Sequence, residues 1–204
     1  MHSTLEIRAR EAEQFLQRLR QSTASQHRRL EESPVSLRLM QDDLSLQDYI
    51  SYLLRMKSVI FYSEQIIYPQ LDGLLADLAE RKKLHWIEAD LIALGADPAS
   101  MEYQPGFFSE ATTGFYLGFA YVIEGSTLGG RVLYKQVQKR LGITNSLGAS
   151  FFYGYGPDTG TKWKIFLETV GDFAVAAKAE TQIISGARRA FETIHEHFSK
   201  PFAS

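Results

Sequence analysis

The stretch FYLGFAYVIEGSTLGGRVL, residues 115–133, combines the apolar spacing of a helix with a high density of glycine. Gly118, Gly125 and Gly129 lie seven and four residues apart, which places them on roughly one helical face, and Gly130 adjoins them. Each glycine inside a helix costs about 0.5–1 kcal/mol relative to alanine, so some other interaction must offset that cost. Either the glycines permit close helix packing or a kink, or they let a flat ligand lie against bare backbone.

The rest of the chain also follows a helical period. Apolar or neutral residues recur every three or four positions from Leu16 through His27 until Pro34 ends the first helix, and Ser45 with Asp48 forms a capping pattern for the second. We expect further helices over 45–69, 74–94, 107–141 and 161–198, loops over 95–106 and 145–160, and interruptions at Gly171 and Gly186. The sequence therefore predicts an all-α, single-domain helical bundle over 1–204, with 1–15 as an N-terminal extension of the first helix.

Composition is that of an ordinary globular protein and excludes several classes of function. The 204 residues are 45% hydrophobic and 23% charged, which suffices for one domain with a sizeable core. The formal net charge is -2 and Lys and Arg are scattered, so we expect neither a nucleic-acid nor a membrane partner. Cysteine is absent, which removes thiolate ligands and cysteine nucleophiles. The N-terminus is charged where a signal peptide would be apolar, and we expect a cytoplasmic protein.

Two histidines are candidates for a metal ligand. His27 belongs to the apolar stripe of the first helix and should point inward, while His195 flanks a stripe near the C-terminus. Either residue taken alone is more often a satisfied core or boundary histidine than a ligand, and spacing does not decide between the two readings.

Three other motifs indicate different chemistry but lack the context that each requires. The glycines of 154–160 resemble a loosened dinucleotide loop, yet no alternating strand and helix pattern surrounds them. Glu192 and His195 form one Glu-x-x-His step, whereas di-iron bundles use two. The stretch 125–130 has neither the Lys nor the Ser/Thr ending of a phosphate loop.

Two segments taken together resemble the heme oxygenase family. Residues 22–31, STASQHRRLE, resemble the helix that carries the proximal iron ligand, and residues 121–133, YVIEGSTLGGRVL, resemble the glycine-rich distal helix. The likeness continues through Tyr49, 90–95, 151–156 and Trp163, so that it covers roughly 16–198. The bacterial, biliverdin-producing branch is the most similar.

This resemblance implies a heme sandwiched between a proximal helix and a kinked, glycine-rich distal helix. It makes His27 the iron ligand. Arg20 lies seven residues before His27, about 10 Å along the same helix face, which suits the span from iron to a heme propionate. Lys164 matches a second cation of the family, with Lys162 and Arg28 as substitutes. The other implied residues are Tyr121 and Phe191 along the ring, with Tyr116 and Phe119 as further aromatic candidates, and the distal, catalytic segment of Gly125, Ser126, Gly129 and Gly130.

The activity implied is the oxidative opening of heme to biliverdin, ferrous iron and carbon monoxide. Heme would be both substrate and cofactor, O2 the co-substrate, a ferredoxin or flavoprotein reductase the electron donor, and a bilin-accepting protein a further partner. Animal members carry an aspartate where this chain has Ser126, so backbone carbonyls freed at a kink would have to order the distal water. The alternatives are a non-catalytic heme carrier or sensor and, on Glu192 and His195, a di-iron oxidase.

Overall fold

The computed structural model describes residues 2–99 and 112–200, which form helices and no β-strand. The α-helices are α1 (His2–Glu31), α2 (Pro34–Arg38), α3 (Leu46–Tyr62), α4 (Leu84–Ala93), α5 (Thr113–Leu141), α6 (Ser150–Tyr153), α7 (Thr159–Ala176) and α8 (Glu180–Ser199). Short π- and 3-10 helices lie between them: η1 (Ser63–Ile67), η2 (Tyr68–Leu71), η3 (Leu78–Arg81) and η4 (Gly156–Asp158). The predicted all-α fold is confirmed, while the expected loop over 100–106 and the expected helix start over 107–111 lie outside the described residues.

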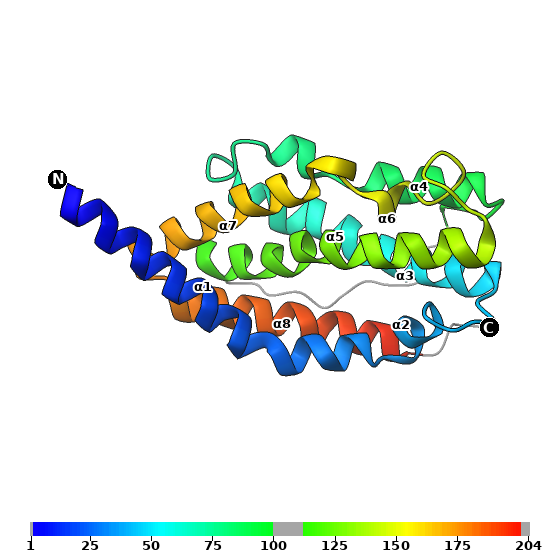
Figure 1. The fold of residues 1–204 in the computed structure, drawn as a ribbon, viewed down its shortest axis with the longest axis horizontal. Helices are drawn as coiled ribbons and strands as arrows, with labels where there is room; N and C mark the ends of the chain where they lie inside the picture. Colours follow the sequence, from blue (N-terminus) through cyan, green and yellow to red (C-terminus); the bar gives the residue numbers. More distant parts are fainter. Residues whose placement is uncertain (1, 100–111, 201–204) are drawn as a thin grey trace.

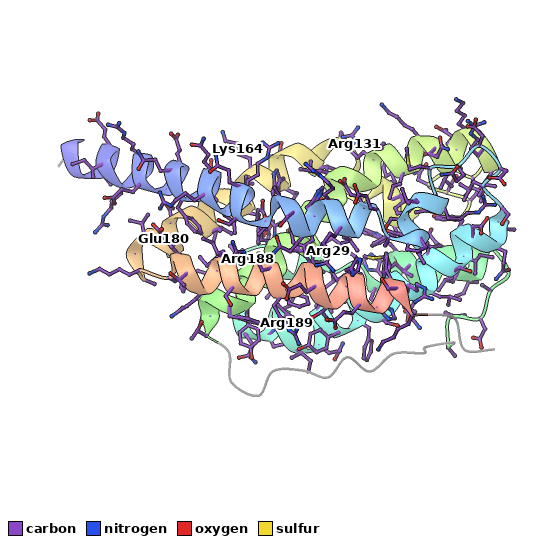
Figure 2. The ribbon with its side chains drawn as sticks, turned by 90° about the horizontal axis from the view of Figure 1, so that it is seen from below. Arg29, Arg131, Lys164, Glu180, Arg188 and Arg189 are labelled. Atoms are coloured by element: carbon purple, nitrogen blue, oxygen red, sulfur yellow. The ribbon has the colours of Figure 1, made fainter. Side chains whose placement is uncertain are left out.

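Helices α5 and α8 run side by side and make the most extensive packing in the bundle (Figure 1). Helix α1 packs on α8 and α7, and its N-terminal part projects beyond the other helices (Figure 1). Arg188 Nε donates a hydrogen bond to the backbone oxygen of Ser22 at 2.9 Å, which joins α8 to α1 (Figure 2). Because α1 and α5 both pack on α7 and α8, these two helices fix the position of α1 relative to α5. Within 2–99 and 112–200, no helix has the length and apolar character required to cross a membrane.

Local sequence signals explain some helix ends and tertiary contacts explain others. The capping box at the start of α3 is confirmed, because Ser45 Oγ accepts from Asp48 N at 3.2 Å and Asp48 Oδ2 accepts from Ser45 N at 3.0 Å. The predicted helix over 74–94 is wrong in its first half, which contains only η3. Helix α4 begins later, because the buried Glu64 carboxylate accepts a hydrogen bond from Leu84 N at 2.8 Å.

The predicted interruptions at Gly171 and Gly186 are wrong. The break between α7 and α8 falls at 177–179, where Lys178 has a φ of 54°. Gly171 and Gly186 lie inside helices because they allow close packing. A Cβ added to Gly171 would lie 3.0 Å from Ala12 Cβ, and one added to Gly186 would lie 1.9 Å from the backbone oxygen of Phe115.

Substitution of Gly118 by alanine should destabilise the fold. A Cβ at this position would lie 2.0 Å from the backbone oxygen of Ile183, so α5 and α8 would have to separate. We expect Gly118→Ala to lower the free energy of unfolding in urea by about 1–3 kcal/mol, although alanine is the better helix former. Gly129→Ala is the control, because its Cβ would meet nothing within 4 Å. Equal stability of Gly118→Ala and the wild-type protein would contradict this packing role.

Candidate functional site

Two glycines of α5 lie on an open face of that helix. Among the described residues, a Cβ added to Gly129 would meet no atom within 4 Å, and one added to Gly125 would meet only the Trp163 ring, at 3.4 Å and beyond. The neighbouring Leu128 and Val132 are 40% and 58% exposed. This face therefore combines bare backbone with exposed apolar side chains, which are the features that a flat apolar ligand would cover.

The other two glycines of the same pattern pack against protein. Gly118 faces α8, and a Cβ on Gly130 would lie 3.2 Å from the backbone oxygen of Phe152. The two readings of the glycine pattern thus apply at different positions: Gly118 and Gly130 permit close packing, whereas Gly125 and Gly129 leave space.

Hydroxyl groups modify the helix backbone beside the open face. Ser126 Oγ donates to the Ile123 oxygen at 2.7 Å, and Thr127 Oγ1 donates to the Glu124 oxygen at 2.6 Å. Such side-chain bonds compete with the helix ladder and favour bending. Because its proton is used within the helix, the Ser126 hydroxyl oxygen can only accept a further hydrogen bond.

His27 lies near the end of α1 beside the side chain of Phe191 from α8. The two rings meet edge to face, with centroids 5.5 Å apart at 85°. The side chain of His27 is 57% exposed, so the prediction that it points into the core is wrong. Leu19 and Thr23 of the same stripe are buried and Leu30 packs against the core, so His27 is an exposed member of a stripe that otherwise faces inward.

The second ring nitrogen of His27 is the one available to a ligand. His27 Nδ1 lies 3.3 Å from Glu31 Oε2, one helical turn away. A carboxylate beside one imidazole nitrogen favours the tautomer that leaves the lone pair on the other, which is the arrangement usual for metal-binding histidines. His27 Nε2 therefore has the chemistry of an axial ligand.

Tyr121 of α5 and Trp163 of α7 lie together beside Gly125, and Arg20 of α1 acts on Tyr121 through its charge. Burial raises the pKa of the Tyr121 hydroxyl, and the positive charge of Arg20 opposes that rise, so the two side chains are within electrostatic reach. The rings of Tyr121 and Trp163 lie 5.4 Å apart. The predicted Arg20 and Tyr121 are therefore near each other and near the open face.

The other predicted cations are arranged differently. Lys164 projects from α7, is 79% exposed and lies 3.9 Å from Glu168 Oε1 (Figure 2). Lys162 is engaged elsewhere, because its Nζ donates to Asp77 Oδ2 at 2.9 Å and also to Glu80. Arg28 is exposed on α1. Lys164 and Arg28 thus have the exposure that a rim cation needs, whereas Lys162 is held in ion pairs.

The remaining aromatic and histidine candidates lie away from the open face or at its border. Phe119 is 1% exposed and packs on Tyr62 of α3, with ring centroids 6.1 Å apart. Tyr116 is half-buried near the start of α5. His195 is half-buried on α8. The described ranges contain no group of three or more His, Asp or Glu side chains that could hold a metal ion, so the di-iron reading has no ligand set there.

A buried charged cluster next to the glycine segment was missed by the sequence reasoning. Glu124 is 1% exposed and accepts hydrogen bonds from Arg81 Nη1 at 2.6 Å, Tyr68 at 2.9 Å and Tyr155 at 3.0 Å, and from Lys83. The only signal in the sequence was one glutamate within an apolar stretch of α5, and its partners lie more than thirty positions away along the chain.

The opposite charges of this cluster stabilise one another, as the pKa shifts of its members show. Burial alone would raise the pKa of Glu124, but the adjacent Lys83 and Arg81 bring that pKa below its ordinary value. Burial lowers the pKa of Lys83, and Glu124 opposes that effect. Burial and the Glu124 charge both raise the pKa of Tyr155, whose hydroxyl therefore stays protonated and donates. The cluster is an anionic Glu124 surrounded by donors.

The fold and the site define a class: an all-helical bundle in which a histidine-bearing helix and a helix with bare glycines flank a shared pair of helices. The sequence profile described as heme oxygenase matches residues 13–200. The chain therefore belongs to the heme oxygenase family. The predictions of this family and of an oxidoreductase are confirmed.

Individual relatives agree with this assignment. A protein named heme oxygenase from Xanthomonas campestris pv. campestris (strain 8004) is 30% identical over 116 residues, which cover 56% of this chain and 66% of that relative. The NO- and CO-bound heme oxygenase from Neisseria meningitidis superposes with a TM-score of 0.74 at 26% identity, covering 93% of this chain and 94% of that one. Heme oxygenase from Leptospira interrogans shares the fold, with a TM-score of 0.71 at 17% identity over 91% of this chain and 98% of that one.

Proposed function

We propose that this chain opens heme oxidatively to biliverdin, ferrous iron and carbon monoxide, using O2 and electrons from an external donor such as a ferredoxin or a flavoprotein reductase. The observation that carries the proposal is the open face of α5, where a Cβ on Gly129 would meet no atom of the described ranges within 4 Å and apolar side chains are exposed. In a member of this family, such a face fits the oxygen side of a heme.

The residues present fit a heme in chemical type. His27 would bind the iron through Nε2, because Glu31 engages Nδ1. Arg20 and Lys164 would pair with the anionic propionates, and Tyr121 and Phe191 would lie along the ring. When bound, heme supplies both the iron that activates O2 and the ring that is oxidised.

The distal segment would act by leaving room and by holding water. Gly125 and Gly129 carry no side chain that could block small molecules, Gly130 would let the segment pack closely on Phe152, and the Ser126 hydroxyl can accept a hydrogen bond from a water molecule. A water molecule held there would be able to pass protons to the oxygen that is being reduced. Ser126 would thus contribute without the aspartate that animal relatives have.

Turnover in air separates an oxygenase from a heme carrier. We expect the protein to bind hemin one to one and, given ascorbate or a reductase couple with catalase present, to lose its Soret band and release biliverdin and carbon monoxide. Catalase is included because free peroxide bleaches heme without an enzyme. A complex that keeps its Soret band under these conditions would favour the carrier. If pigment forms only when catalase is left out, free peroxide has produced it, and this result would also contradict the oxygenase proposal.

A further inference from the structure

Among residues 2–99 and 112–200, the contacts that hold the segment Gly125–Gly130 lie mainly on its buried face. On the open face it has few side chains to hold it, and the hydroxyls of Ser126 and Thr127 compete with its helix hydrogen bonds. The position of such a helix segment is therefore determined by the contacts of its buried face.

The first rear attachment is Glu124, the residue immediately before the segment. Its carboxylate accepts hydrogen bonds from Tyr68 after α3, from Arg81 and Lys83 before α4, and from Tyr155 before α7. Arg81 is in turn held by Asp77, with Nε to Oδ1 at 2.7 Å. A buried charge with all its partners in place tolerates little displacement, because any shift leaves a charge or donor unsatisfied.

The second rear attachment lies at the other end of the glycine segment and uses residues 152–156, between the end of α6 and the start of η4. Gly130 packs against the backbone of Phe152, and Arg131 Nη1 donates to the Gly156 oxygen at 3.1 Å (Figure 2). Tyr155, which binds Glu124, belongs to the same stretch. The segment 152–156 therefore holds both ends of the glycine segment.

We propose that Glu124 is a positioning residue whose buried contacts fix the segment Gly125–Gly130 and thereby set the space on the oxygen side of the heme. The role in the reaction rests on the function proposed above. The anchoring itself is a property of the protein alone and can be measured without heme.

The test removes donors to Glu124 without removing a charge. Glu124→Gln would leave Arg81 and Lys83 buried without their anion and could prevent folding. The double variant Tyr68→Phe/Tyr155→Phe deletes two hydroxyls that donate to Glu124 and keeps the rings. Tyr49→Phe is the matched control, because the buried Tyr49 hydroxyl donates to the Gly148 oxygen at 2.9 Å, away from this cluster.

Amide hydrogen exchange is measured first on the heme-free proteins. In the double variant we expect exchange over 124–131 to become about tenfold faster, with exchange near the end of α5 unchanged. Tyr49→Phe should leave exchange over 124–131 at the wild-type rate. Unchanged amide exchange in the double variant, or an equal rise in the exchange rate of Tyr49→Phe, would contradict the proposal that Glu124 anchors the segment.

The second measurement is the ratio of biliverdin isomers formed from hemin. A displaced distal segment should change which ring carbon is attacked, so we expect the ratio to shift about twofold or more in the double variant and not in Tyr49→Phe. Faster exchange with an unaltered ratio would overturn the positioning role. If the wild-type protein forms no biliverdin, the proposed function fails, and the exchange measurement still decides whether Glu124 anchors the segment.

Discussion

His27→Ala is expected to abolish the imidazole-type spectrum of the ferric heme complex and the ring-opening activity. Because the side chain of His27 is 57% exposed and its ring meets Phe191 only edge to face, its removal should cost less than about 1 kcal/mol of stability. The loss should therefore be one of ligation and not of folding. Absorption spectra with hemin and the far-ultraviolet circular dichroism of the apoprotein measure the two effects separately.

The control for this prediction is His195→Ala on α8. His195 is half-buried, and we place no heme contact on it, so this variant should keep both the spectrum and the activity. Added imidazole should restore the spectrum of His27→Ala by occupying the space of the missing ring. An exchange of phenotypes between the two variants, or a failure of imidazole to restore the spectrum, would show that His27 is not the ligand.

Gly129→Leu is expected to lower ring opening by about 100-fold or more while heme still binds. The first atom of the new side chain would enter space where no atom of residues 2–99 or 112–200 lies within 4 Å, so that part of the protein can accept it. The rest of the side chain would occupy the oxygen side of the proposed site. Thermal stability should stay the same or rise, since leucine is the better helix former by up to about 1 kcal/mol. Turnover and the thermal midpoint are measured on the same preparation.

Gly160→Leu is the matched control, because a Cβ on Gly160 also meets nothing within 4 Å but lies in the first turn of α7. It should keep wild-type turnover. Gly125→Leu should resemble Gly129→Leu, with an added displacement of Trp163. Wild-type turnover in both distal variants would mean that these glycines only assist packing and that heme lies elsewhere.

Local patterns predicted the helical class of the fold and several of its boundaries. The spacing of apolar residues indicated helices along the chain, and the Ser45–Asp48 capping box needed only neighbours three residues apart. The break at 177–179 carried no comparable signal. The position of this break depends on how α7 and α8 pack against the other helices. Lys178 therefore takes a positive φ at the break, whereas Gly171 and Gly186 lie inside continuous helices.

The candidate site could be named from the sequence but not assembled from it. The spacing of Gly118, Gly125 and Gly129 is that of one helix face, yet Gly118 packs on α8 and Gly129 faces open space. Spacing along one helix cannot distinguish these cases, because the atoms that fill or leave the space come from α8, far along the chain. The exposure of His27 has the same origin, since it depends on how much of the His27 ring Phe191 of α8 covers.

What the sequence by itself determined is therefore local: the helical period, the caps, the absence of thiol ligands, and the motifs that mark the family. Tertiary structure alone decided which glycines are bare, which face of α1 stays exposed at His27, and how a single glutamate in an apolar helix is neutralised. The physical reason is that burial and electrostatics depend on distance in space. Glu124 meets Arg81 and Lys83 across 43 and 41 residues of chain, and only the folded bundle brings those charges within hydrogen-bond reach.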